Sequence, residues 1–557
     1  MILSAEQQFH GIWSGQNNMT ISDGKILELN LDKIKISSSG VDDFYWPVNP
    51  FEISTLYLKI FRSLITVLKG AKAKKLMGAD AAIVLYPYFL HEVMSTYDAY
   101  LLVSRSLKDE VILNPSGNRW LNSVLQKNFS VDSSGVIQKL LVGPSRPKWW
   151  RAPFRVTRDL LVSRQECMAR HSLKPINHKK NIISITINSL PISQAKLKNE
   201  KIYYKRLTTW FKKPKLASQS NNKVYDEIIE SIISSVSESL LLKKMTLPDY
   251  IFDFFKAWLY RAIPLVEYHC KQLEKNTQKL PQRLWVDTAG NLWGRILARC
   301  VKNEGGCVTR FAHGAALGYY SSSTQHGTYE LEDCDIYSVF TDIQASIFKT
   351  LFTVQDTVQE VMPNIRCVPN NHFLNSLADH RNIKNSEKTV MYVGPAYLGG
   401  NFHAGAIAPM HDIVLLDWEV RLLSAIQAWG MPVILKPHPK ESICMATPSS
   451  LENLLGKIIL NERFEYVYNS ADIILIDHPQ TSIFPTIILS GKPFVYIDFG
   501  VTEFSEHAFS LLKKRCPIVK GWYDENNRAQ VDWEQLKTAI NSAHKYSNNE
   551  FASYYFQ

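Results

Sequence analysis

Residues 283–311 read RLWVDTAGNLWGRILARCVKNEGGCVTRF and contain a complete β-α-β pattern. The apolar run RLWVD leads into the turn TAGN, the helical period LWGRILARCVKN follows, and the turn EGG introduces a second apolar run, CVTRF. Short apolar runs that alternate with helical periods are typical of parallel sheets whose strands are connected by crossover helices. This stretch therefore predicts an α/β fold.

The same alternation extends in both directions along the chain. Downstream we predict strands at 336–340, 389–394, 432–439, 472–477 and 493–498, with helices at 413–429, 449–460 and 481–489. Upstream we predict strands at 81–86, 110–113 and 181–188, and mostly helix over 224–258 with a break at Leu247 and Pro248.

The length of the chain predicts more than one domain. It has 557 residues, about twice the length at which a single hydrophobic core stops growing. The interval 371–388 is polar and separates two α/β blocks. We therefore predict two Rossmann-like doubly wound domains, 1–380 and 381–557, that face each other across a cleft. We expect the closing helix at 533–544 to cross back to the first domain.

Composition excludes several classes of protein. Hydrophobic residues make up 45% of the chain and charged residues 21%, unlike the apolar-poor composition of disordered proteins. No apolar run reaches the ~18 residues of a membrane span, and the N-terminus does not have the pattern of a secretory signal. The eight cysteines contain no CxxC pair, which argues against a structural zinc site. We expect a cytoplasmic protein with reduced thiols.

Two basic stretches carry part of the net charge of +11. Residues 146–158 and 196–215 interleave cations with aromatic side chains, a pattern that suits an anionic membrane surface, an anionic glycan or single-stranded nucleic acid. The alternative is a solvated basic face without a specific partner. We favour peripheral contact with the inner membrane or a glycan, and expect no nucleic acid.

The first candidate site follows the predicted strand at 433–435, where Lys436, Pro437, His438 and Pro439 form the sequence KPHP. Ligands of open α/β sheets bind at the carboxyl ends of the strands. The two prolines stiffen the backbone, so that the ammonium and imidazole groups can be presented to an anion. The alternative is a rigid loop with an exposed lysine and a structural histidine.

The second candidate site is the sequence DHPQTS at 477–482, which follows another predicted strand. Gln480 precedes Thr481 and Ser482, which we place at a helix N-terminus, where free N–H groups and the helix dipole attract a phosphate. The alternative is that one of these hydroxyls only caps the helix. If the two strands are adjacent, both candidate sites face one cleft and form a single phosphate site.

At this point the sequence resembles bacterial capsule and lipopolysaccharide glycosyltransferases of the GT-B fold, which carry an HP motif followed by a Ser/Thr-rich helix start. They include Kdo transferases, sialyltransferases and polysialyltransferases that use CMP-linked donors. The resemblance is strongest over 389–497, weaker over 283–345, and does not extend to the first 220 residues.

The resemblance implies roles for particular residues. Lys436 and His438 would hold the donor phosphate, Thr481 and Ser482 would complete that site, and Gly394 would let the nucleotide approach the first strand of the domain. The chain departs from the pattern of these families in the helix that follows, where 484–486 read FPT and such families often have a glutamate.

Two residues of the first half are candidates for catalysis. Asp287 ends the run RLWVD, and His313 with Gly314 follows the run CVTRF. We assign Asp287 as general base or nucleophile and His313 as sugar ligand or proton donor, with Asn291 and Gly314 in acceptor-binding or supporting positions. The alternative is that Asp287 caps the helix and His313 binds loop backbone.

The acidic sequence EDCD at 332–335 contains a DxD pattern, but it precedes a predicted strand instead of following one. We interpret Glu330, Glu332, Asp333 and Asp335 as a solvated rim or an acceptor contact. We expect no metal cofactor, because lysine and histidine can neutralise a leaving phosphate without one.

Together these features predict a metal-independent glycosyltransferase that moves a sugar from a nucleotide-activated donor, first of all CMP-Kdo or a related nonulosonic acid, to a bacterial surface polysaccharide or lipid-linked glycan. Closure of the two domains would expel water before transfer. The alternatives are a UDP-sugar-dependent transferase, a nucleotide-sugar epimerase or a polyol-phosphate transferase of the same fold. A non-catalytic assembly protein at the membrane surface is a further alternative.

Overall fold

The computed structural model describes residues 26–28, 31–114, 118–144, 181–186, 189–200, 202–211, 214, 222–242, 246–275, 280–286, 290–312, 318–321, 330–351, 357–368, 388–397, 410–438, 448, 451, 462, 464–479, 483–500 and 502–556. Within these ranges, no helix has both the length and the apolar character that crossing a bilayer requires.

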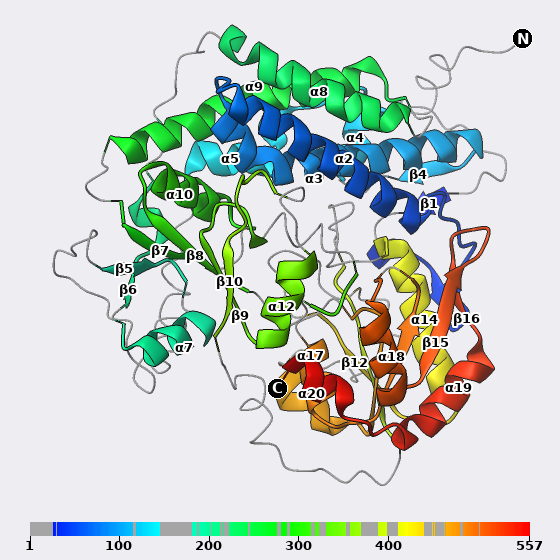
Figure 1. Ribbon diagram of the computed structural model, residues 1–557. Helices are drawn as coiled ribbons and strands as arrows, with labels where there is room; N and C mark the ends of the chain where they lie inside the picture. Colours follow the sequence, from blue (N-terminus) through cyan, green and yellow to red (C-terminus); the bar gives the residue numbers. More distant parts are fainter. Residues whose placement is uncertain are drawn as a thin grey trace, which may run out of the picture.

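The molecule is built on two six-stranded sheets, one at the left and one at the lower right of Figure 1. The first has the order β10-β9-β8-β7-β5-β6 and is parallel throughout. Its strands are β5 (Ile182–Ser184), β6 (Ile202–Tyr204), β7 (Arg283–Val286), β8 (Cys307–Phe311), β9 (Ile336–Val339) and β10 (Asn364–Cys367). The predicted α/β class is confirmed.

The second sheet has the order β12-β11-β13-β14-β15-β16, and only its edge strand β16 is antiparallel to its neighbour. Its strands are β11 (Val390–Val393), β12 (Val433–Lys436), β13 (Ile473–Ile476), β14 (Phe494–Asp498), β15 (Ile518–Tyr523) and β16 (Ala529–Val531). When the strands of each sheet are numbered along the chain, both sheets have the order 2-1-3-4-5-6. This order is consistent with two Rossmann-like halves, a first half that contains β5–β10 and a second half that contains β11–β16.

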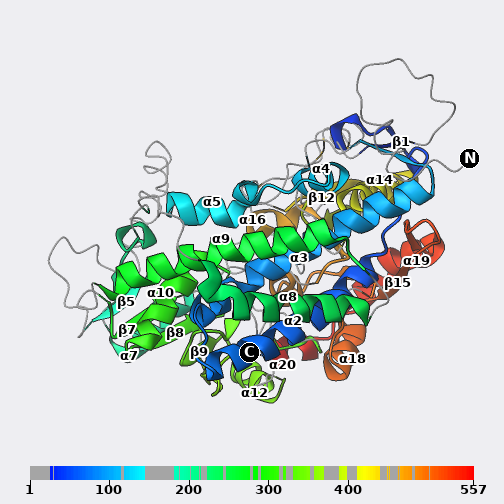
Figure 2. The same ribbon diagram turned by 90° about the horizontal axis from the view of Figure 1, so that it is seen from above.

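A layer of helices lies along one side of both sheets, as Figures 1 and 2 show from two directions. It consists of α2 (Pro50–Ala73), α3 (Ala79–Lys108), α4 (Arg119–Leu125), α5 (Gly135–Val142), α8 (Asp226–Leu241) and α9 (Asp249–Glu274). α10 (Leu292–Asn303) contacts both this layer and strands β7 and β8. The predicted helical region with a break before Asp249 is confirmed.

The predicted strand at 81–86 is wrong, because these residues lie within α3. Every residue from Ala81 to Pro87 is buried, so the apolar run has no helical period that would distinguish it from a buried strand. Pro87 also removes the N–H that would bind the Ile83 carbonyl. Arg295 of α10 replaces it and donates to the carbonyls of Ile83 (2.9 Å) and Val84 (3.1 Å).

Most other predicted elements are present. β7, α10 and β8 occupy 283–311 as predicted, and α14 (Asp412–Ala428) lies within one residue of its predicted bounds. The predicted helix at 449–460 lies almost entirely outside the described residues. The remaining described elements are β1 (Ile26–Glu28), β2 (Ile36–Ser37), β3 (Gly40–Val41), β4 (Ile112–Asn114), α7 (Ser189–Lys198), α12 (Asp342–Leu351), α16 (Phe464–Val467), α17 (Phe484–Leu489), α18 (Glu506–Arg515), α19 (Trp533–Ser542) and α20 (Glu550–Phe556).

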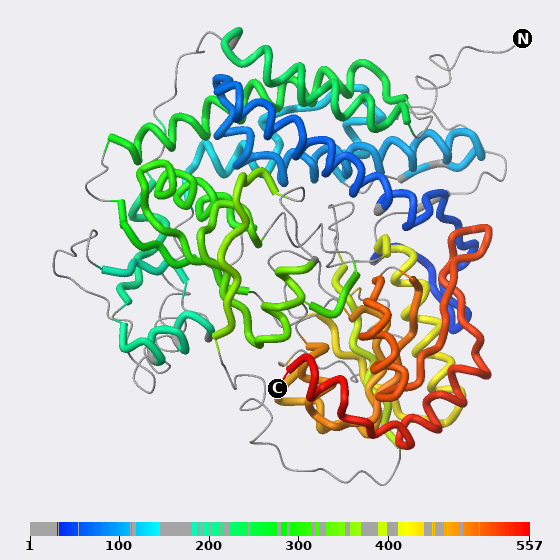
Figure 3. Tube along the Cα trace, in the orientation of Figure 1, coloured from blue at the N-terminus to red at the C-terminus, as the bar shows by residue number. Residues whose placement is uncertain are grey.

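Residues 31–49, here called the N-terminal strap, lie against the second half of the chain before α2 enters the helical layer (Figure 3). The Val41 N–H donates to Asp417 of α14 (2.9 Å), and Asn527 donates to the Trp46 carbonyl (2.8 Å). Asp417 is fully buried and also accepts from Arg421 and Arg528. Long-range polar contacts thus fix the strap to α14 and to the loop before β16.

The C-terminal segment makes a second connection between the halves. α19, predicted to cross back, packs on β14 and β15 of the second sheet. The shorter α20 contacts α12 beside the first sheet as well as α17 and α18, and Thr341 donates to the Tyr555 carbonyl (3.4 Å). The two halves are therefore joined at both ends of the chain.

Candidate functional site

The carboxyl edge of the second sheet carries the two sequence motifs, but their strands are not neighbours. β11 lies between β12 and β13, and Val393 is paired in register with both Lys436 and Ile476. With a strand spacing of about 4.8 Å, the two strand ends are roughly 10 Å apart. The expected adjacency is wrong. The strand order instead reverses between β11 and β13, and such a point is where ligands of doubly wound sheets bind.

Asp477 is the first residue after β13 and lies at this reversal. Its Oδ2 accepts hydrogen bonds from the Tyr392 hydroxyl (2.7 Å) and the Trp418 indole (2.8 Å). Its Oδ1 is buried and has no hydrogen-bond partner among the described residues. Burial raises the pKa of Asp477 to about 6, although both hydrogen bonds oppose this shift. A buried carboxyl group with a raised pKa therefore immediately precedes the HPQTS sequence.

Gly394, after β11, leaves room for a second buried acid. A Cβ at this position would lie 2.5 Å from the Glu419 Oε1, and the other oxygen of Glu419 accepts from the Tyr397 hydroxyl (2.6 Å). Burial raises the pKa of Glu419 to about 8. The space beside Gly394 is thus filled by a carboxyl group of the same half, which accounts for the glycine without a nucleotide.

Lys436 is not presented to the cleft as the sequence predicted. Its side chain is fully buried and its ammonium group donates to the Pro437 carbonyl (2.7 Å). Burial lowers the pKa of Lys436, with the charges of Glu465 and Glu462 opposing the shift. His438 is half-buried at the end of the described segment. Of the two expected phosphate ligands, His438 is therefore the more accessible.

The second motif is described only in part. His478 is buried, and the Pro479 carbonyl accepts a hydrogen bond from the Tyr320 hydroxyl (2.6 Å). Pro439, Gln480, Thr481 and Ser482 lie outside the described residues. The helix that follows begins at Phe484 instead of residue 481 and is six residues long. Because the helix is short, its dipole stabilises a bound anion less than the sequence suggested.

In the first half, Asp287, His313 and Gly314 also lie outside the described residues. The strands that precede them, β7 and β8, are paired neighbours, so both strand ends reach the same edge of the sheet. Asn291 caps α10, because its side-chain oxygen accepts from the N–H groups of Trp293 (3.0 Å) and Gly294 (3.3 Å). The cap considered above for Asp287 is thus supplied by Asn291.

The segment that follows the loop after β8 crosses to the second half. Residues 318–321, here called the docking segment, form an antiparallel bridge between Tyr320 and Phe504. The Ser321 N–H donates to the Glu503 carbonyl and the Ser505 N–H to the Tyr319 carbonyl, each over 2.9 Å. The loop with His313 is therefore followed, within a few residues, by a segment bound next to Pro479.

The prediction that the acidic cluster is a solvated rim is wrong for three of its four residues, whereas the Asp335 side chain is 39% exposed. Glu330, Glu332 and Asp333 are buried, and Asp333 forms an ion pair with Arg299 over 2.8 Å. Glu332 accepts from the Val358 N–H (2.6 Å). These residues lie at the amino-terminal ends of β9 and β10, so they stabilise the side of the sheet opposite to the candidate site.

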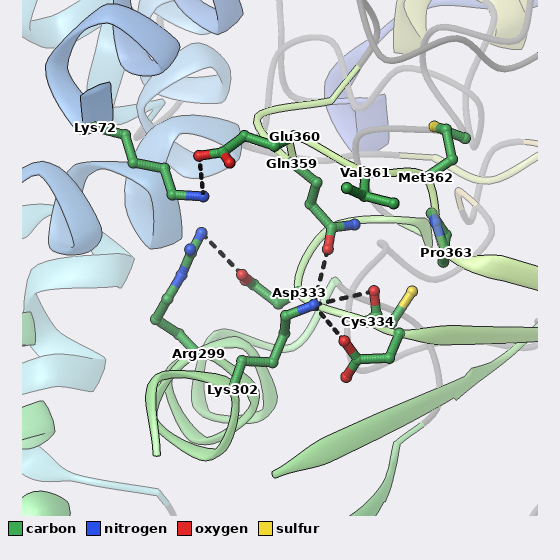
Figure 4. A pocket seen from close by; sticks show the side chains of 11 residues that line it. Lys72, Arg299, Lys302, Asp333, Cys334, Gln359, Glu360, Val361, Met362 and Pro363 are labelled. Carbon is green, nitrogen blue, oxygen red and sulfur yellow. Dashed lines mark hydrogen bonds and ion pairs between the residues drawn. The ribbon is translucent and has the colours of Figure 1, made fainter. Parts of the chain in front are cut away.

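A pocket of about 250 Å³ lies at this opposite edge (Figure 4). Lys72, Arg299 and Lys302 line it together with Asp333, Asp335 and Glu360. Each cation has an acidic partner, and Lys302 also donates to the Gln359 side chain (3.0 Å). Three positive and three negative charges balance, so the pocket has no excess charge that would select a phosphate.

The basic stretches are described in part. Residues 146–158 lie outside the described residues, and in 196–215 Lys205 lies over the Trp210 ring, 3.8 Å from its centroid. Within the described part of the chain, no group of three or more His, Cys, Asp or Glu side chains is arranged to hold a metal ion.

Sequence reasoning missed the buried acids Asp477 and Glu419 and the contact of Tyr320 with Pro479. One signal was present for Glu419, because the helix sequence IVLLDWEV at 413–420 places two carboxylates in an otherwise apolar run. The contact of Tyr320 depends on two loops that are distant in sequence, and no local pattern indicates it. No protein family model and no curated protein sequence matches this chain at a significant level.

Proposed function

We propose that this protein is a glycosyltransferase that uses a nucleotide-activated sugar, with a CMP-linked nonulosonic acid as the first candidate donor. One observation carries the proposal. The docking segment, a few residues after β8 of the first sheet, contacts Pro479 and Phe504, which follow β13 and β14 of the second sheet. Two sheets of the same order that are linked in this way, from the carboxyl end of a strand in each, suit a reaction between two substrates.

In this proposal the second half holds the donor. His438 and the loop 478–482 bind the phosphate and stabilise the charge of the leaving nucleotide. Lys436 contributes to the potential at the site without direct contact, because its ammonium group is bound to the Pro437 carbonyl. Asp287 or His313 activates the acceptor hydroxyl from the first half.

A nucleotide-binding measurement tests the donor site directly. Thermal unfolding is followed with CMP, CDP, UDP and GDP, because a ligand selective for the folded state stabilises it by about 2.7 kcal/mol at a hundredfold excess over its dissociation constant. CMP should raise the melting temperature of the wild type and not of His438→Ala. His544→Ala, which removes an exposed histidine of the same half, is the matched control and should respond as the wild type does.

Catalysis is tested separately from binding. Asp287→Asn should retain the response to CMP and lose release of CMP from a CMP-linked sugar. If none of the four nucleotides stabilises the wild type, or if His438→Ala responds to CMP unchanged, the proposed donor site is wrong.

A further inference from the structure

The docking segment is held by the second half through its backbone. The antiparallel bridge between Tyr320 and Phe504 is flanked by the two backbone hydrogen bonds to Glu503 and from Ser505. These contacts are those of a short strand pair, and they fix the orientation of both tyrosine side chains of the segment.

Aromatic packing anchors the same segment. Tyr319 is fully buried, with its ring centroid 5.9 Å from that of Phe504, 5.6 Å from that of Phe551 and 5.7 Å from that of Tyr555. Tyr320 is 3% exposed, and its ring centroid lies 5.3 Å from that of Phe504. Ring contacts of this kind hold the segment in place without the Tyr320 hydroxyl.

The Tyr320 hydroxyl donates to the Pro479 carbonyl over 2.6 Å in a buried environment. Burial raises the pKa of Tyr320 well above its usual value, so the group stays a donor over the whole physiological range. Pro479 is followed directly by Gln480, Thr481 and Ser482. A single hydrogen bond from the first half thus fixes the backbone at the start of the proposed phosphate loop.

We propose that Tyr320 is a positioning residue that couples the two halves of the site. Its hydroxyl fixes the Pro479 carbonyl, so the docking segment and the backbone at Pro479 are held as one unit, and a change at the acceptor side alters donor binding. The functional part of this inference rests on the proposed function. The mechanical part, which is the coupling of the docking segment to Pro479, does not.

Tyr320→Phe tests the coupling, because it keeps the ring and removes only the hydroxyl. Tyr496→Phe is the matched control, since Tyr496 is a buried tyrosine in contact with Phe504 whose hydroxyl donates to Asp498 within its own half (3.1 Å). Hydrogen exchange of peptides that cover 478–484 is measured by mass spectrometry without nucleotide. We expect about tenfold faster exchange there in Tyr320→Phe only.

CMP binding is the second readout. Tyr320→Phe should raise the dissociation constant for CMP about tenfold, and Tyr496→Phe should not. Unchanged exchange over 478–484 in Tyr320→Phe, or an equal increase in both variants, would overturn the coupling. If the wild type does not bind CMP, the proposed donor is wrong, and the exchange measurement still decides whether the docking segment is coupled to Pro479.

Discussion

Replacing Asp417 by asparagine should release the N-terminal strap from the second half. Asp417 is fully buried, and its Oδ1 accepts from the Val41 N–H (2.9 Å) and from Arg528 (2.7 Å). Its Oδ2 accepts from Arg421 (2.8 Å) and again from Arg528 (2.9 Å). An asparagine keeps one acceptor oxygen and turns an NH₂ group toward donors, so at least two of these bonds are lost and two guanidinium groups remain without their counter-ion.

The expected effect is large. Removing one partner of a buried ion pair costs about 3 to 5 kcal/mol, and Arg528 is partly exposed, which favours the lower value. For an unfolding unit of about 150 to 250 residues, 3 kcal/mol corresponds to a melting temperature lower by roughly 6 to 12 °C. The second half with the strap is a unit of this size.

Differential scanning calorimetry measures the shift, and limited proteolysis followed by mass spectrometry reports whether cleavage within 31–49 becomes faster. Glu550→Gln is the control, because the pair of Glu550 with Lys514 is exposed and its loss should not change the melting temperature measurably. A melting temperature of Asp417→Asn within about 1 °C of the wild type, with unchanged cleavage of the strap, would refute the reasoning.

Three further predictions concern buried groups. The pKa of Glu419 is raised to about 8 from an ordinary value of 4.5, so between these pH values the folded state retains a proton that the unfolded state releases, and the free energy of unfolding falls as pH rises. In Glu419→Gln, the free energy of unfolding should fall less steeply, by up to about 1.4 kcal/mol per pH unit, in urea titrations at pH 5 and 8. Gly394→Ala should destabilise by about 1 to 3 kcal/mol in the same assay, because its Cβ meets the Glu419 carboxylate, and a neutral result would show that the carboxylate can move. Arg295→Met should destabilise the protein less in a Pro87→Ala background than in the wild type, because Pro87→Ala restores the N–H for the Ile83 carbonyl. A coupling free energy below about 0.5 kcal/mol in the double-mutant cycle would contradict this.

The sequence predicted elements correctly where local periodicity and turn residues agree. The stretch 283–311 has glycines at both turns and a helix with one apolar face, so its β-α-β unit follows from local rules. The same rules failed at 81–86, where burial on all sides removed the helical period, and only the length of α3 distinguishes it from a strand.

The candidate site was less predictable because it depends on strand order. KPHP and DHPQTS each follow a strand as expected, but sequence alone does not specify that β11 lies between those strands. The same applies to Lys436, whose residue type suggested exposure while its side chain is buried. The strap and the docking segment depend on contacts across hundreds of residues, which no local pattern encodes.

The position of the strap also has a consequence for synthesis of the chain. Arg528, which donates to the Ser39 carbonyl, is 489 positions further along the sequence. At about 5 to 20 residues per second, a ribosome needs roughly 25 to 100 s to reach it. The Trp46 ring, whose centroid lies 4.7 Å from that of His411, and the Trp46 carbonyl, which accepts from Asn527, also depend on residues that are made hundreds of positions later, so the strap is an apolar target for chaperones until most of the chain has been translated.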